Sequence, residues 1–126
     1  TLLHHHKFYN SIHLSLSYSI IFFFFIDRYK LMIYTITGNH LYNIDISDMS
    51  SPKGLHILPA DDSVLVSDWV YTGEVRKYKL QAGTHHQPVW TCTGLTNPLG
   101  ITSDQSDLIY VVSSTEKKIY QISPQG

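Results

Sequence analysis

The feature of this sequence that most constrains its fold is an internal repeat, found without gaps at an offset of 46 residues. Six positions carry the same or a similar residue at this offset: Pro52 and Pro98, Gly54 and Gly100, Leu55 and Ile101, Asp61 and Asp107, Val66 and Val112, Ser67 and Ser113. Repeats of this length are single supersecondary units that bury their apolar faces only against neighbouring units. The chain is therefore expected to stack similar units side by side.

The repeated unit is made of short β-type segments. From Leu31 onward, runs rich in β-branched and aromatic residues alternate with Gly, Pro, Asn and Asp, and no window keeps helical spacing for more than about two turns. A period in the forties that holds about four short strands is typical of a β-propeller blade. We therefore predict an all-β fold, a β-propeller fragment of roughly two and a half four-stranded blades.

Such a fragment does not close a ring, so the remaining propeller blades are expected to be missing from this chain. An unclosed propeller leaves sheet faces and strand edges uncovered. In the unit that begins at Leu31, only the five residues 47–51 separate Ile46 from Pro52. Either the outermost strand of this unit is absent, or residues 41–46 are themselves that strand.

The first thirty residues differ in amino-acid composition from the rest of the chain. Residues 20–26 are a continuous apolar run that contains four consecutive Phe residues and follows a serine-rich stretch. The whole stretch is too short and too polar for a typical membrane span, and Asp27 and Arg28 stand where a signal peptide needs small residues. Four consecutive Phe codons also imply a pyrimidine-rich tract of the kind that precedes a splice acceptor. We expect residues 1–30 to lie outside the fold, as translated non-coding sequence, a signal or an anchor, and residues 31–126 to form the partial propeller.

Three segments of the second copy resemble an NHL repeat, the unit of one family of six-bladed β-propellers. They are Pro98-x-Gly100-Ile101, the Leu-Ile-Tyr-Val run of residues 108–111 and the Lys-Ile-Tyr-Gln-Ile run of residues 118–122. The resemblance extends from Leu31 to the end of the sequence. Residues 66–69, Val-Ser-Asp-Trp, are also similar to the YWTD class of extracellular propellers, which is our second choice.

The resemblance implies an interaction module that binds a protein or peptide on the surface of the ring. Asp68 and Trp69 stand where a predicted strand reaches that surface, and Tyr71 and Arg76 follow closely. Trp, Tyr and Arg are the residue types that most often dominate binding energy at protein interfaces. We predict Asp68, Trp69, Tyr71 and Arg76 as the binding residues, with Val64, Val66 and Val112 among the residues that pack between blades.

The alternative is a fragment of a six-bladed propeller hydrolase, of the calcium-dependent lactonase-like or strictosidine-synthase-like kind. Such an enzyme would need carboxylate, amide or imidazole ligands on its innermost strands, and this chain offers only His56 and Asp104 there. Asp61, Asp62, Asp107 and Asp104 itself stand at predicted tight turns, where Asp caps its own backbone. We therefore predict no catalytic residue, no metal site and no cofactor, and expect a function other than catalysis.

Composition excludes further classes of function. Nine Lys and Arg residues stand against ten Asp and Glu, a net charge of −1, so no basic surface for nucleic acid is expected. A single cysteine, Cys92, excludes an internal disulfide and a cysteine-rich zinc site. An extracellular receptor would carry flanking cysteine-rich modules, which this sequence lacks. Membrane contact is expected only if the Phe-rich segment is an anchor, and the sequence does not fix the compartment.

Overall fold

The computed structural model describes residues 12–17, 20–27, 29–35, 37–83 and 86–126. Their regular structure is all β, apart from one short 3-10 turn, η2 (Pro59–Asp61). The strands are β1 (Ile12–Ser17), β2 (Ile20–Asp27), β3 (Lys30–Thr35), β4 (His40–Asp45), β5 (Pro52–Leu58), β6 (Ser63–Asp68), β7 (Gly73–Lys79), β8 (Trp90–Leu95), β9 (Pro98–Ser103), β10 (Ile109–Ser113) and β11 (Lys118–Ile122). The described residues contain no helix long and apolar enough to cross a membrane. The predicted all-β class is confirmed.

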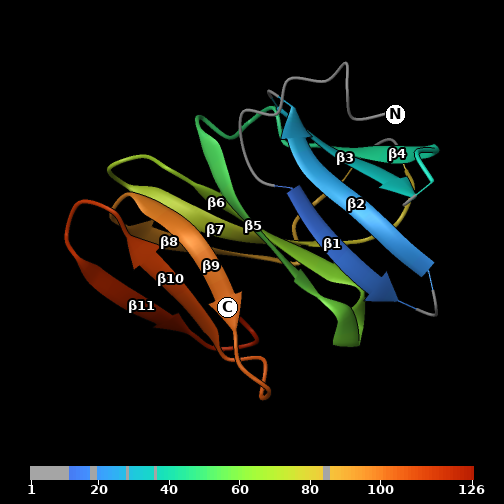
Figure 1. Cartoon of the computed structure of the whole chain (residues 1–126). Helices are drawn as coiled ribbons and strands as arrows, with labels where there is room; N and C mark the ends of the chain where they lie inside the picture. Colours follow the sequence, from blue (N-terminus) through green and yellow to red (C-terminus); the bar gives the residue numbers. More distant parts are fainter. Residues whose placement is uncertain (1–11, 18–19, 28, 36, 84–85) are drawn as a thin grey trace.

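The strands form three antiparallel sheets in which neighbours along the chain are also neighbours in space (Figure 1). The first sheet has the order β1-β2-β3-β4, the second β5-β6-β7-β8, and the third comprises β9, β10 and β11. Strand β5 contacts both β1 and β9, so the second sheet lies between the other two. Strand β4 is the last strand of the first sheet, which agrees with the alternative that residues 41–46 form an outermost strand.

The expectation that residues 1–30 lie outside the fold is wrong for β1 and β2. Strand β2 pairs with β3 from Phe22 opposite Thr35 to Asp27 opposite Lys30, and β1 pairs with the other edge of β2. A continuous apolar run bounded by polar residues fits a buried strand as well as a leader or an anchor, and Phe and Ile favour strands. The origin of this segment, as non-coding sequence, signal or anchor, stays a prediction.

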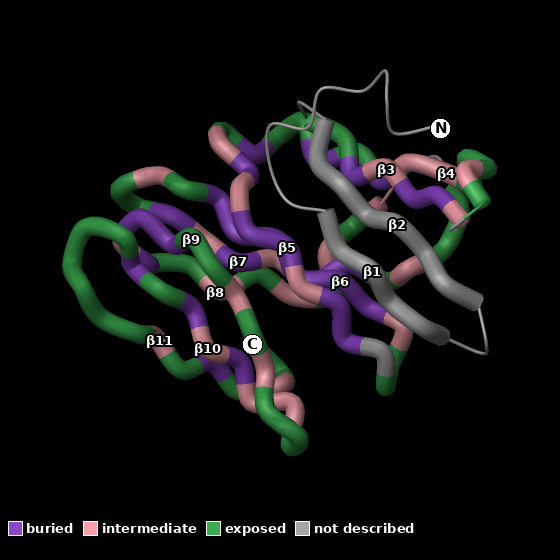
Figure 2. The backbone as a smooth tube through the Cα atoms, viewed as in Figure 1, coloured by how far each residue is buried: buried purple, intermediate pink, exposed green. Residues whose placement is uncertain are grey.

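A first hydrophobic core lies between the first and second sheets (Figure 2). The first sheet contributes the alternate residues Leu31 and Ile33 of β3, and β6 contributes Val64 and Val66. All four side chains are fully buried or nearly so. Alternate residues of a strand point to the same face, so the predicted packing of Val64 and Val66 between sheets is confirmed.

A second core lies between the second and third sheets. The strand register in the third sheet differs by one residue from the register that the repeat predicts. In the second sheet Leu55 pairs with Val66, but in the third sheet Ile101 pairs with Val111 rather than with Val112. A slip of one residue turns every side chain of a strand to the other face. Val111 is therefore buried in the second core, whereas Val112, predicted to pack there, is 45% exposed.

The third sheet approaches the second closely at Gly54. The backbone N–H of Gly54 donates a hydrogen bond to Ser67 Oγ at 2.8 Å, and this hydroxyl donates to the carbonyl of Leu99 at 2.7 Å. A Cβ atom at residue 54 would overlap the Leu99 carbonyl oxygen, whereas a Cβ at Gly100 would meet nothing within 4 Å. The two glycines that correspond in the repeat therefore differ, because only Gly54 lies where the backbones of two sheets approach closely.

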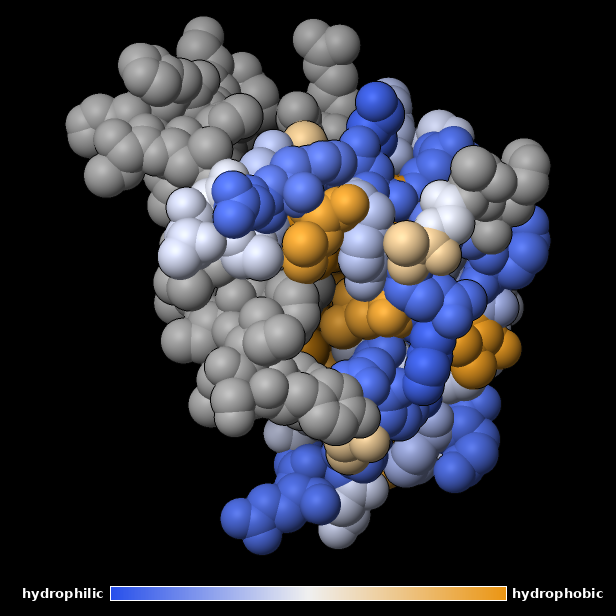
Figure 3. All heavy atoms as spheres, turned by 90° about the vertical axis from the view of Figure 1, so that its right-hand side faces the viewer, coloured by the Kyte–Doolittle hydropathy of each residue, from blue (hydrophilic) through white to orange (hydrophobic). Residues whose placement is uncertain are grey.

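Exposed hydrophobic side chains mark the surfaces that the three sheets leave uncovered. On the side shown in Figure 3, hydrophobic residues are visible as a few small areas beside hydrophilic ones. The large exposed hydrophobic residues among the described part of the chain are Tyr29, Leu41, Trp69, Tyr71, Val89, Leu99, Val112 and Ile119. Trp69 and Tyr71 belong to the turn between β6 and β7, and Val112 and Ile119 belong to the third sheet.

Candidate binding surface

The turn between β6 and β7, residues 69–72, is fixed by backbone hydrogen bonds to two other loops. The N–H of Trp69 donates to the carbonyl of Ser51 at 2.8 Å, and the carbonyl of Val70 accepts from the N–H of Asn97 at 2.9 Å. Val70 N–H also donates to the Asp68 carbonyl at 3.0 Å within the turn. The turn is therefore a defined platform, since loops from both sides hold its backbone.

Trp69 and Tyr71 present their rings to solvent from this platform. Trp69 is 38% exposed, and its indole N–H donates to Ser114 Oγ at 2.7 Å, which orients the ring. Tyr71 is 76% exposed, more than any other large hydrophobic side chain in the described residues. Exposed aromatic rings on a fixed backbone offer large contact area at a low cost in conformational entropy. These two predicted binding residues are accessible and adjacent.

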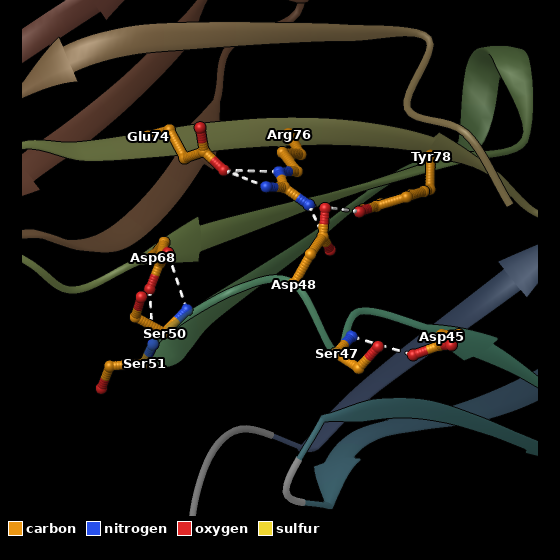
Figure 4. A network of polar contacts seen from close by, with 9 residues as sticks. All are labelled: Asp45, Ser47, Asp48, Ser50, Ser51, Asp68, Glu74, Arg76 and Tyr78. Carbon is orange, nitrogen blue, oxygen red and sulfur yellow. Dashed lines mark hydrogen bonds and ion pairs between the residues drawn. The ribbon is translucent and has the colours of Figure 1, made fainter.

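Asp68 has a different role from the one predicted. Its side chain is 5% exposed, and its two carboxylate oxygens accept hydrogen bonds from the N–H groups of Ser50 and Ser51, at 3.0 and 2.6 Å (Figure 4). A buried carboxylate is stable only when such donors compensate for its lost hydration. Asp68 therefore anchors the loop before β5 and is not placed to contact a partner.

Arg76, predicted as a basic anchor, is also engaged inside the molecule. Its guanidinium donates to Glu74 at 2.5 Å, to Asp48 at 2.7 Å and to the Tyr78 hydroxyl at 3.2 Å (Figure 4). Burial by itself would lower the pKa of Arg76, but the hydrogen bonds to Tyr78 and Asp48 and the charge of Glu74 outweigh it and raise the pKa. Glu74, Arg76 and Tyr78 are alternate residues of β7, and Asp48 belongs to the loop between β4 and β5, so Arg76 links β7 to that loop.

A small open pocket lies beside this network. It has a volume of about 190 Å³ and is lined by Asp45, Ser47, Asp48, Tyr78, His86, Gln87 and Pro88. The Asp45 carboxylate accepts hydrogen bonds from Ser47, and these lower the pKa of Asp45. The pocket is polar, and no group of three or more His, Cys, Asp or Glu residues in the described chain is arranged to hold a metal ion.

The inner strands β5 and β9 bring together a pair that sequence reasoning missed. The Nε2 atom of His56 lies 2.7 Å from Ser103 Oγ, and burial lowers the pKa of His56. Asp104, the other candidate ligand on these strands, accepts hydrogen bonds from the N–H groups of Ser106 and Leu108 at 2.8 and 3.1 Å. The prediction that Asp104 caps its own turn is confirmed, and so it is no partner for His56.

The pKa of His56 predicts a pH dependence of stability. The unfolded imidazole titrates near its ordinary value of 6.5, and the folded one titrates below it. As the pH falls through this window the unfolded state binds more protons, so the free energy of unfolding falls. We expect His56→Gln, whose side chain stays polar, to reduce this fall. Urea unfolding from about pH 7.5 to about pH 5, at one protein concentration, measures the free energy of unfolding of both proteins. If this free energy falls equally with pH in the native chain and in His56→Gln, His56 is not the cause of the pH dependence.

Solved structures with the same arrangement of sheets identify the fold. No protein-family model and no curated protein matches the sequence. The crystal structure of Mala s 1, the major allergen of Malassezia sympodialis, matches with a TM-score of 0.65 and 14% identity, over 92% of this chain and 46% of that one. It is a β-propeller. This chain has a β-propeller-like fold.

A second solved structure supports the same conclusion. A protein of unknown function from Bacteroides caccae matches with a TM-score of 0.58 and 16% identity, over 90% of this chain and 42% of that one. The β-propeller-like chain thus spans less than half the length of both solved structures. At these identities the likeness concerns the fold alone, because propellers carry many unrelated functions.

Proposed function

We propose that this chain is an interaction module, part of an NHL-type β-propeller that binds a protein or peptide through the turn between β6 and β7. The observation that carries the proposal is the exposure of Trp69 and Tyr71 on a turn whose backbone is held from both sides. Tyr and Trp on fixed backbone are the usual anchors of protein interfaces. Asp68 contributes indirectly, since its carboxylate fixes the loop that receives the Trp69 N–H.

Selection from a phage-displayed library of random peptides on the immobilised full chain tests this proposal. We expect enriched peptides whose affinity falls about tenfold or more in Tyr71→Ala or Trp69→Ala, because truncation of an anchor residue costs that much. Tyr71→Ala is the sharper variant, since the Tyr71 side chain is 76% exposed and contributes little to folding.

The matched control for this selection is Val89→Ala. Val89 is also an exposed hydrophobic residue, at 56%, and it precedes β8 at the end of the second sheet opposite to Tyr71. Peptide binding should be unchanged in this variant. Failure to enrich any peptide, or enrichment of peptides that bind Tyr71→Ala and Trp69→Ala as well as the native chain, would refute the proposal.

A second candidate function, a propeller hydrolase, is favoured by the His56–Ser103 contact alone. A serine hydroxyl 2.7 Å from an imidazole nitrogen has the geometry of a nucleophile and its general base. A lowered pKa keeps His56 in the neutral form that accepts a proton. Labelling of the chain with a fluorophosphonate probe, followed by mapping of the modified residue, tests this function. Labelling of Ser103 that is lost in His56→Gln would support it, and unlabelled Ser103 in the native chain would eliminate it.

A further inference from the structure

We propose that the partner presents a proline-rich segment, which lies on the rings of Trp69 and Tyr71 as a polyproline II helix. This inference rests on the proposed function and names the class of peptide that the β6–β7 turn binds. The exposed rings of the turn, its lack of charge and the hydrogen bonds of its backbone each favour such a segment over other peptides.

Trp69 offers a partner the surface of its ring rather than its N–H group. The indole N–H donates to Ser114 Oγ at 2.7 Å and is therefore engaged within the chain. Tyr71, two residues further along the turn, adds a second exposed ring. Proline rings dock on exposed aromatic side chains in the domains that recognise polyproline II segments. The turn therefore supplies the kind of surface that successive prolines contact.

The turn carries no charge that would select a charged peptide. Residues 69–73 are Trp, Val, Tyr, Thr and Gly. The carboxylates on either side are engaged, since Asp68 accepts two backbone hydrogen bonds and Glu74 pairs with Arg76. Recognition of acidic or phosphorylated motifs needs accessible Arg side chains, and the Arg76 side chain is only 12% exposed. An uncharged segment such as a run of prolines fits this surface.

The backbone of the turn is not an edge to which a β-strand could be added. The N–H groups of Trp69 and Val70 and the carbonyl of Val70 already make hydrogen bonds within the chain. A polyproline II helix suits recognition by side chains, because it is preformed and leaves its carbonyl oxygens unpaired. Proline has no N–H group, so the segment needs donors only. The exposed residues Tyr71 and Thr72 carry hydroxyl groups that can donate.

The size of the surface favours a short extended segment over a helix. An amphipathic helix docks in a groove through anchors at i, i+3, i+4 and i+7, which span about two helical turns. The β6–β7 turn comprises only residues 69–72, and its exposed rings are those of Trp69 and Tyr71. Two rings on so short a turn match the spacing of prolines along one extended segment.

Competition binding tests this inference on the peptides that the phage selection enriches. An enriched peptide labelled with fluorescein is bound to the full chain, and a peptide of about ten prolines or a glycine–serine peptide of equal length is added. We expect an excess of proline in the enriched peptides, displacement by the proline peptide and none by the glycine–serine peptide. Replacement of the prolines of an enriched peptide by alanine should weaken its binding about tenfold or more.

Tyr71→Phe separates the two contacts proposed for Tyr71, since it keeps the ring and removes the hydroxyl donor. Its affinity for the proline peptide should fall about threefold, against about tenfold or more in Tyr71→Ala. Val89→Ala, the control of the selection, should bind the proline peptide as the native chain does. Circular dichroism of each variant should keep the β spectrum, because the side chains of Tyr71 and Val89 are exposed.

The outcomes separate this inference from the proposed function. Enriched peptides that depend on Tyr71, but have no excess of proline and are not displaced by the proline peptide, would overturn the inference and leave the proposed function intact. Binding of the proline peptide that is unchanged in Tyr71→Ala and Trp69→Ala would also overturn it, since the peptide would then lie elsewhere. A selection that enriches no peptide would refute both.

Discussion

Alanine at Gly54 is expected to destabilise the fold by about 3 kcal/mol or more, at the upper end of the cost of overpacking. The new Cβ would overlap the carbonyl oxygen of Leu99 and lie 2.6 Å from Ser67 Oγ. The Leu99 carbonyl belongs to the backbone of β9, so no side-chain rotation relieves the overlap. The second and third sheets must then move apart, which breaks the Ser67–Leu99 hydrogen bond and opens the second core.

The repeat provides a matched control for this prediction. Gly100 occupies the corresponding position in the third sheet, but a Cβ there would meet nothing within 4 Å. Gly100→Ala should change the free energy of unfolding by less than about 1 kcal/mol. Urea unfolding of both variants measures the difference. Similar effects of the two substitutions would show that the sheets do not approach each other at Gly54.

Removal of the Asp68 carboxylate is expected to cost about 3 kcal/mol. Asp68→Ala leaves the N–H groups of Ser50 and Ser51 without their acceptors, and each hydrogen bond to a charged group contributes about 1.5–3 kcal/mol. The loop before β5 then loses its anchor, and Trp69 loses the fixed position of its Ser51 partner. Weaker binding of any peptide that contacts Trp69 should accompany the loss of stability.

Asp48→Ala is the matched control for Asp68→Ala. Asp48 is another carboxylate of the same polar network, but its side chain is 72% exposed. An exposed ion pair contributes only about 0–1 kcal/mol, and Arg76 keeps Glu74 as a partner. Thermal unfolding of the two variants compares the effects directly. Equal losses of stability would mean that the Asp68 hydrogen bonds are worth no more than a surface ion pair.

The candidate site shows which binding residues the sequence can predict and which depend on the tertiary structure. Trp69 and Tyr71 were recognisable because they are large aromatic residues at the end of a predicted strand, and the structure leaves both exposed. The closeness of Asp68 and Arg76 to these residues in the sequence predicts the same surface for them. Their partners are far along the chain, however: Asp68 binds N–H groups 17 and 18 residues away, and Arg76 binds Asp48 28 residues away.

Contacts between residues far apart in the sequence also explain the other differences between the sequence-based predictions and the structure. The His56–Ser103 contact joins residues 47 positions apart, and no local motif marks it. The burial of Val111 in place of Val112 depends on one residue of register between β9 and β10. An offset between repeats in the sequence does not fix that register, because a β-bulge in one strand shifts it by one residue.

The sequence by itself determined the all-β class, the punctuation of the strands and the chemistry of the turns. Asp62 and Asp107 adopt positive φ angles of 51° and 62° at turns that were predicted from residue type, because local steric preferences and side-chain capping act within a few residues. Only the tertiary structure decided that residues 12–17 and 20–27 add two strands to the first sheet, which face of β10 is buried, and that Asp68 and Arg76 bind partners within the chain. These outcomes depend on which distant backbone and side-chain groups satisfy one another, and such pairings are set when the sheets pack together.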